Sequence, residues 1–216
     1  MENVTTEVSN PFGIRYRGLA VPGYGDANAD VHVVGDHPGR HGGAATGVPF
    51  TGSVAGVRLQ RVLYAVGLLA DRYADHPDAT NCFLSYAHPP VRGSDTEESS
   101  ADADASPAFA PDEADYVDAE RYLDAELRAI NAHILVLVGD RALAYGLREH
   151  TALADRLPVD AAALHAQEVT GRGFLLVPVK EPTAWTPADE HALRNRLQTI
   201  LSRDYRQTKG VATTIG

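Results

Sequence analysis

Four polar side chains stand close together in a stretch that is otherwise mostly glycine, proline and alanine: Asp36, His37, Arg40 and His41. A carboxylate can orient a water molecule, while histidine and arginine can donate hydrogen bonds to an anion. The surrounding glycines carry no side chains, so backbone N–H groups can also approach a ligand closely. We therefore expect this stretch to carry the chemistry of the protein.

The flanking sequence predicts the elements that hold these side chains. Residues 31–34 form a β-branched run typical of a strand, and residues 53–69 have apolar residues at helical spacing. The order is strand, glycine-rich loop and helix, and the positive end of the helix dipole favours an anion at the loop. Neither the dinucleotide fingerprint G-x-G-x-x-G nor the P-loop spacing occurs in this loop.

The loop resembles the first motif of the uracil-DNA glycosylase superfamily. Residues 35–39 read Gly-Asp-His-Pro-Gly, similar to its water-activating loop G-x-x-P-G/A. Residues 46–56 are similar to the downstream pattern T-G-x-P-F-x-G-x-x-G. The His-Gly-Gly and Thr-Gly elements resemble families 4 and 5 of this superfamily. The resemblance implies that the protein excises uracil or another deaminated base from DNA. The expected partner is DNA that contains such a base.

The resemblance also implies roles for residues of the loop. Asp36 would stabilise the cationic sugar and orient the attacking water. Phe50 would stack on a base flipped out of the duplex, although a core phenylalanine is the alternative. Gly35 and Pro38 would line the base pocket.

A second base contact depends on how the next strand is aligned. Family members carry an asparagine there that hydrogen-bonds to the uracil edge. Asn81 takes this role if two extra residues separate it from the following Pro-Pro pair. Without that insertion Phe83 occupies the position, and Asn81 only caps a turn at the strand start.

Two positions depart from the family pattern. Residues 181–183 read Glu-Pro-Thr where the superfamily has His-Pro-Ser, whose histidine stabilises negative charge on the departing uracil. A carboxylate cannot donate to that charge unless its pKa is strongly raised. The aspartate of the family 5 element G-D-x-S-G is also absent from residues 52–56. The expected catalytic residues are Asp36, His37 and Glu181.

Cationic and aromatic residues near the expected site are candidates for binding DNA. Arg141 begins a helix at a position that family members use near the DNA backbone, or it is an ordinary surface arginine. Trp185 lies where relatives insert an apolar wedge into the duplex, or it packs in the core. Lys180 is, like His37, a candidate to replace the lost histidine. The expected DNA-binding residues are Arg40, Arg141, Lys180 and Trp185.

Four apolar runs predict the central sheet. They alternate with helical patterns, which is typical of parallel strands, and cover residues 31–34, 81–86, 134–139 and 174–179. The predicted fold class is α/β, a three-layer α/β/α sandwich with a central four-stranded parallel sheet. Sites in such sheets lie at the carboxyl ends of strands. The polar residues expected at those ends are Asp36, Asn81, Asp140 and Glu181.

The sequence predicts one domain with three less regular segments. Residues 1–29 are rich in turns and are expected to wrap over the sheet, and residues 30–205 form the domain. An acidic insertion at about 93–115 and a tail at 206–216 are expected to be flexible. The insertion is either a solvated loop or a segment that mimics DNA.

The formal net charge of −10 is unusual for a DNA-binding protein, because phosphate contacts require cations. The acidity either belongs to the insertion or adapts the surface to high salt, and the scarcity of lysine favours a halophilic source. The alternative is an acidic protein that never binds DNA. The chain has no apolar run of membrane-spanning length and no leader pattern, so we expect a cytoplasmic protein. We also expect a monomer.

Cys82 is the only cysteine of the chain. Families 4 and 5 usually hold an iron–sulfur cluster with four cysteines, so we expect no such cofactor and no metal here. Three functions remain open. They are a metal-independent DNA glycosylase, a catalytically degenerate member that binds DNA or a nucleobase, and a small-molecule hydrolase on a similar sheet.

Overall fold

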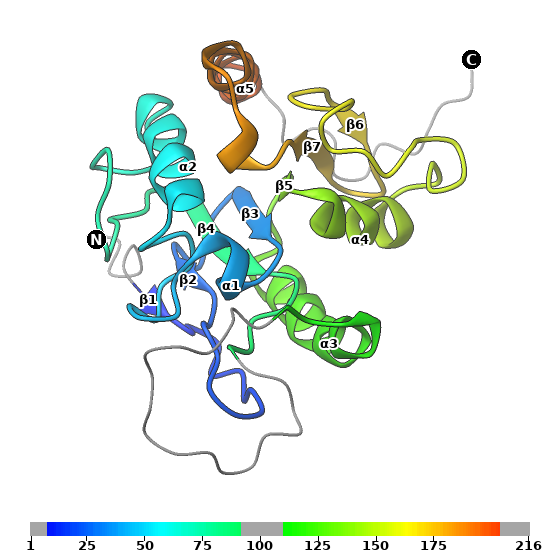
Figure 1. Ribbon diagram of the computed structural model, residues 1–216. Helices are drawn as coiled ribbons and strands as arrows, with labels where there is room; N and C mark the ends of the chain where they lie inside the picture. The colour runs from blue at the N-terminus through cyan, green and yellow to red at the C-terminus, as the bar shows by residue number, and fades with distance from the viewer. Residues whose placement is uncertain (1–7, 92–109, 204–216) are drawn as a thin grey trace.

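A computed structural model of the protein describes residues 8–91 and 110–203. Within these ranges one seven-stranded sheet has the order β1-β2-β4-β3-β5-β7-β6 (Figure 1). Its central strands are parallel and are β4 (Cys82–Tyr86), β3 (Val31–Gly35), β5 (Ile134–Val138) and β7 (Leu175–Val179). Short antiparallel strands extend its edges, namely β1 (Val8–Ser9), β2 (Tyr24–Gly25) and β6 (Val169–Thr170).

The predicted α/β fold is confirmed, with a correction to the number of strands. The four apolar runs form the parallel centre, and every residue of these four strands is buried. Continuous apolar sequence is what a strand covered on both faces requires. The sheet is nevertheless seven-stranded and mixed, because three strands of two residues each were too short to give a periodic signal.

Helices cover both faces of the sheet, as the three-layer prediction requires. One face packs against α2 (Val54–Ala65) and α5 (Pro187–Leu201). The other packs against α3 (Glu113–Ile130) and α4 (Asp140–His150). Two short helices follow the carboxyl ends of β3 and β7, namely α1 (Pro38–His41) and the 3-10 helix η1 (Pro182–Ala184). In Figure 1, α1 lies near the centre of the view.

Side-chain caps fix where α2 and α3 begin. The Ser53 hydroxyl accepts a hydrogen bond from the N–H of Gly56 at the start of α2. Asp112 and Asp115 form a capping box at the start of α3. This helix therefore begins at Glu113, inside the segment predicted to be a flexible insertion. The rest of that prediction, and the predicted tail at 206–216, lie outside the described residues.

The described part of the N-terminal segment is tied to the sheet and to α3. It supplies β1 and β2 at the sheet edge. The Tyr16 hydroxyl donates to Glu126 Oε1 at 2.8 Å, and the N–H of Gly23 donates to the same oxygen at 3.1 Å. Burial raises the pKa of Glu126 to about 7, although these donors lower it. No described helix is long and apolar enough to cross a membrane.

Candidate active site

The carboxyl ends of β3 and β7 bring four polar side chains together. Asp36 follows β3, and Glu181 follows β7. Arg40 and His41 come from α1, which starts two residues after β3. The sequence placed Asp36 and Glu181 at strand ends, and both lie there.

Asp36 is a buried carboxylate with donors on both oxygens; it is 3% exposed. The Tyr116 hydroxyl, from α3, donates to Oδ1, and Arg40 Nη1 lies 3.3 Å from Oδ2. Burial first, and then the hydrogen bond to Asp36, raise the pKa of Tyr116, so the phenol stays protonated. Tyr116 and Arg40 thus hold Asp36 in a fixed orientation.

His41 links the two carboxylate residues. Its Nδ1 accepts a hydrogen bond from the N–H of Asp36 at 3.0 Å, so the ring proton lies on Nε2. Nε2 is 3.1 Å from Glu181 Oε2, and Arg40 Nε donates to the same oxygen at 2.7 Å. Burial would raise the pKa of Glu181, but the hydrogen bond from His41 and the charge of Arg40 lower it below its ordinary value. Glu181 is therefore ionised at neutral pH.

Two further histidines border the site. His37 stands at the N-cap position of α1 but makes no side-chain capping bond, and its buried Nδ1 has no hydrogen-bond partner within the described chain. The His88 ring lies 5.7 Å from the Tyr116 ring. Burial lowers the pKa of both His37 and His88, opposed by the nearby Asp36. Both imidazoles are thus neutral at pH 7.

The aromatic ring predicted to stack on a base is covered. Phe50 is fully buried, with its ring 5.4 Å from His41 and 5.2 Å from Tyr86. A Cβ on Gly35 would lie 2.6 Å from this ring, so the glycine leaves room for it. Pro38 is buried at the start of α1. A base could stack on Phe50 only after His41 moves, so Phe50 is a core residue in this conformation.

Arg141 lies beside the site on the α4 side. Its guanidinium stacks on the Tyr116 ring at 4.4 Å and pairs with Glu113. The side chain is 42% exposed. Arg141 therefore contacts Tyr116, the residue that donates to Asp36, and its side chain is partly exposed to solvent. Asp140, also expected at a strand end, accepts the N–H of Ala161 at 2.8 Å, so it holds a neighbouring loop.

The placement predicted for Asn81 is wrong. This residue precedes β4, so it lies at the amino end of the parallel strands, opposite Asp36. Its Oδ1 accepts the N–H of Asp30 at 2.6 Å, and its own N–H donates to Asp26 at 3.1 Å. Its φ of 57° marks a turn. Asn81 therefore starts the strand, the alternative that the sequence also offered.

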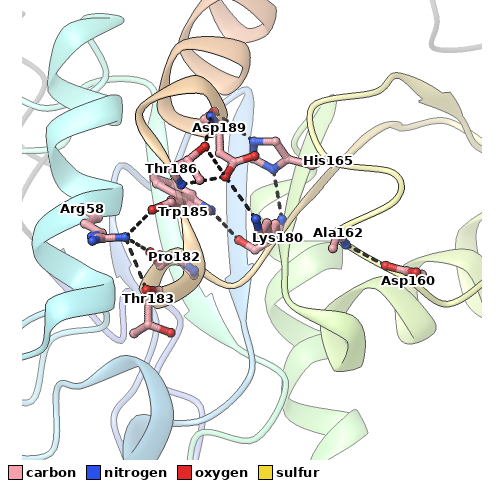
Figure 2. A network of polar contacts seen from close by, with 10 residues as sticks. All are labelled: Arg58, Asp160, Ala162, His165, Lys180, Pro182, Thr183, Trp185, Thr186 and Asp189. Carbon is pink, nitrogen blue, oxygen red and sulfur yellow. Dashed lines mark hydrogen bonds and ion pairs between the residues drawn. The ribbon is translucent and has the colours of Figure 1, made fainter.

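Lys180 and Trp185 belong to a network of polar contacts between the loop after β7 and α5 (Figure 2). Lys180 Nζ lies 3.1 Å from Asp189 Oδ2, at the start of α5. The Trp185 indole is 6% exposed and donates to the Lys180 carbonyl at 2.7 Å. Arg58 donates to the carbonyls of Pro182 and Trp185, both at 2.9 Å, which fastens the loop to α2. In this structure Lys180 and Trp185 hold the loop after β7 in place, and their roles in binding DNA stay predictions.

With this geometry in place, the chain can be compared with known proteins. Residues 22–200 match the family model described as the uracil DNA glycosylase superfamily. The chain belongs to this superfamily. The match covers every element from β2 to α5 except Leu201, the last residue of α5.

Relatives in three organisms are named Type-5 uracil-DNA glycosylase. The protein of Pyrobaculum aerophilum is 31% identical over 128 residues, which is 59% of this chain and 52% of the relative. The protein of Thermus thermophilus is 43% identical over 56 residues, or 26% of each chain. That of Mycobacterium leprae is 27% identical over 201 residues, 91% of this chain and 80% of the relative. The chain thus matches about half, or less, of the first two relatives.

The residues of this chain do not fit the cluster that families 4 and 5 usually hold. A cluster of this kind needs four cysteine ligands, whereas Cys82 is the only cysteine and is buried in β4. Among the described residues, no three His, Cys, Asp or Glu side chains are grouped as metal ligands.

Two residues of the site, Tyr116 and His88, were not among the predicted residues. His41 was named with the polar residues of the loop but was given no role of its own. Tyr116 lies in a helical apolar stripe, which indicates core packing. Only the fold shows that its hydroxyl reaches Asp36, 80 positions earlier in the chain.

Proposed function

We propose that this protein is a DNA glycosylase that hydrolyses the N-glycosidic bond of uracil or another deaminated base. Membership of the superfamily and the names of the relatives support this proposal. The observation that carries it is Asp36, a buried carboxylate held by Tyr116 and Arg40 beside a glycine-rich loop. This is the residue type that orients water for hydrolysis.

Asp36 retains the capacity to act in this way. An ionised carboxylate has about four acceptor positions. The donors from Tyr116 and Arg40 use two of these positions, one on each oxygen. A remaining lone pair can accept a hydrogen bond from the attacking water, and the negative charge stabilises the cationic sugar. The target base must be flipped out of the duplex to reach this point.

The proposal also covers the DNA partner, the cellular environment and the oligomeric state of the protein. Uracil-containing DNA is the proposed partner, with Arg141 as a phosphate contact because it is exposed beside the site. The net charge of −10 supports function in a high-salt cytoplasm, where acidic surfaces stay soluble. We further propose that the protein acts as a monomer.

A second function, a non-catalytic module that binds DNA or a nucleobase, is favoured by two observations. Glu181 is ionised, and the resemblance to the superfamily motif His-Pro-Ser places it where a histidine donor would stand. The Phe50 ring is buried and stacks on the His41 ring, so it is not exposed to a base. Both features would weaken excision without preventing DNA binding.

Single-turnover excision separates the two functions. The purified chain would be incubated, in low and molar salt, with end-labelled oligonucleotides that carry uracil, hypoxanthine or xanthine, followed by alkaline cleavage. We expect strand scission, and Asp36→Asn should lower its rate by about 10²–10⁴-fold, the contribution typical of a general base. Asp155→Asn, an exposed position remote in sequence, is the matched control. Binding without scission at any salt would support the non-catalytic module.

A further inference from the structure

Breaking an N-glycosidic bond leaves negative charge on the departing base, and that charge needs a hydrogen-bond donor. Glu181 cannot be the donor because it is ionised. The Tyr116 hydroxyl already donates to Asp36, and His41 Nε2 already donates to Glu181. These residues have no proton left to offer in this arrangement.

Arg40 is placed differently. Its Nε lies 2.7 Å from Glu181 Oε2 and its Nη1 lies 3.3 Å from Asp36 Oδ2, so the guanidinium spans the two carboxylates. A guanidinium carries five N–H donors. Nη2 has no hydrogen-bond partner in the described part of the chain, and the side chain is 49% exposed. Donors therefore remain, directly beside the carboxylate that orients the water.

We propose that Arg40 is a catalytic residue that donates to the oxygen of the departing base as negative charge develops on it. This inference rests on the proposed glycosylase function. Glu181 is then a positioning residue, since it fixes Nε and leaves the outer N–H groups free. His41 in turn orients Glu181. The chain would thus use a histidine–glutamate pair to hold an arginine donor.

The step balances without any further reagent. The bond between C1′ and the base nitrogen breaks, and its electron pair leaves with the base, whose exocyclic carbonyl oxygen accepts hydrogen bonds from Arg40. The water oxygen bonds to C1′, and the water proton passes to Asp36. Arg40 keeps its own protons, because a guanidinium is not deprotonated in proteins. The base anion and Asp36 then re-equilibrate with solvent, and no net oxidation occurs.

The dependence on the leaving group tests this role. Single-turnover rates would be measured on oligonucleotides carrying uracil or 5-fluorouracil, because fluorine stabilises the departing anion and reduces the need for a donor. Arg40→Ala should lower uracil excision by about 10²–10³-fold, the usual cost of one oxyanion donor, with a clearly smaller loss on 5-fluorouracil. Arg40→Lys should recover part of the rate. Glu181→Gln should show a weaker form of the same preference.

Controls separate catalysis from folding and from binding. Arg128→Ala removes an equally charged but 74% exposed side chain on α3 and should alter neither rate. Melting curves should show both variants folded at the assay temperature, and the DNA affinity of Arg40→Ala should stay close to that of Arg128→Ala. An equal loss on both substrates, or a loss confined to DNA affinity, would overturn the role of Arg40 while leaving the glycosylase intact. No excision by the unaltered protein would overturn both proposals.

Discussion

The loops that follow β3 and β7 both begin at the carboxyl edge of the sheet, yet they use their polar residues in opposite ways. In the loop after β3, Asp36, Arg40 and His41 all turn toward the site. In the loop after β7, only Glu181 does so. Lys180 and Trp185 turn into the protein and hold the loop in place.

The difference arises from what constrains each backbone. The β3 loop contains glycines at positions where neighbouring atoms leave no room for a side chain. At Gly42, for example, a Cβ would lie 2.0 Å from the Thr51 carbonyl oxygen. Such positions fix the loop locally, so the sequence pattern also fixes the side-chain directions. The β7 loop is held by partners distant in sequence, Arg58 on α2 and Asp189 on α5. Sequence alone does not show those partners.

The largest expected effect is on the β7 loop. Trp185→Ala should lower the free energy of unfolding by about 3–5 kcal/mol, the cost of removing a buried tryptophan from a core. Urea denaturation measures this loss. Trp185→Phe, which keeps most of the packing but loses the hydrogen bond to Lys180, should cost about 1 kcal/mol. A stable Trp185→Ala variant with weakened duplex binding would support the wedge interpretation.

The β3 loop should be sensitive to an added methyl group. In Gly35→Ala the new Cβ would meet the rings of Phe50, His41 and Tyr86 at 2.6, 2.7 and 2.9 Å. Overpacking of this kind costs about 1–3 kcal/mol and should also displace the His41 ring and lower excision. Gly47→Ala is the matched control, since no atom lies within 4 Å of its Cβ and only its φ of 74° is strained. Equal excision by both variants would contradict a site fixed by ring packing.

The smallest effect concerns Lys180. Its partner Asp189 has its pKa lowered to about 2, first by the N–H of Thr186 and then by Lys180. A lowered carboxyl pKa stabilises the fold above the ordinary value of 3.8, and this stabilisation is lost as the pH falls toward 2. Lys180→Met should lose less stability over that pH range than the unaltered protein. At pH 7 it should cost less than about 1 kcal/mol and leave excision unchanged.

Much of the fold and part of the site could be predicted from the sequence. The buried strands and the glycine loop have strong local signals, which located β3, Asp36 and Glu181 correctly. The position of Asn81 was wrong because this residue precedes β4, so its amide lies at the amino end of the parallel strands and not at the carboxyl end beside Asp36. Tyr116 could not be assigned, because a helical stripe does not show whether a phenol reaches a carboxylate on another element.

The buried Cys82 makes the protein suitable for labelling at a single introduced cysteine. It is the only thiol of the chain and is fully buried in β4, and burial raises its pKa, so little reactive thiolate forms. Water-soluble maleimides should therefore leave the native protein unlabelled. A cysteine introduced at an exposed position such as Val117 or Val159 would be the single labelling site. Fluorophores or spin labels could then report loop movements without first removing the native cysteine.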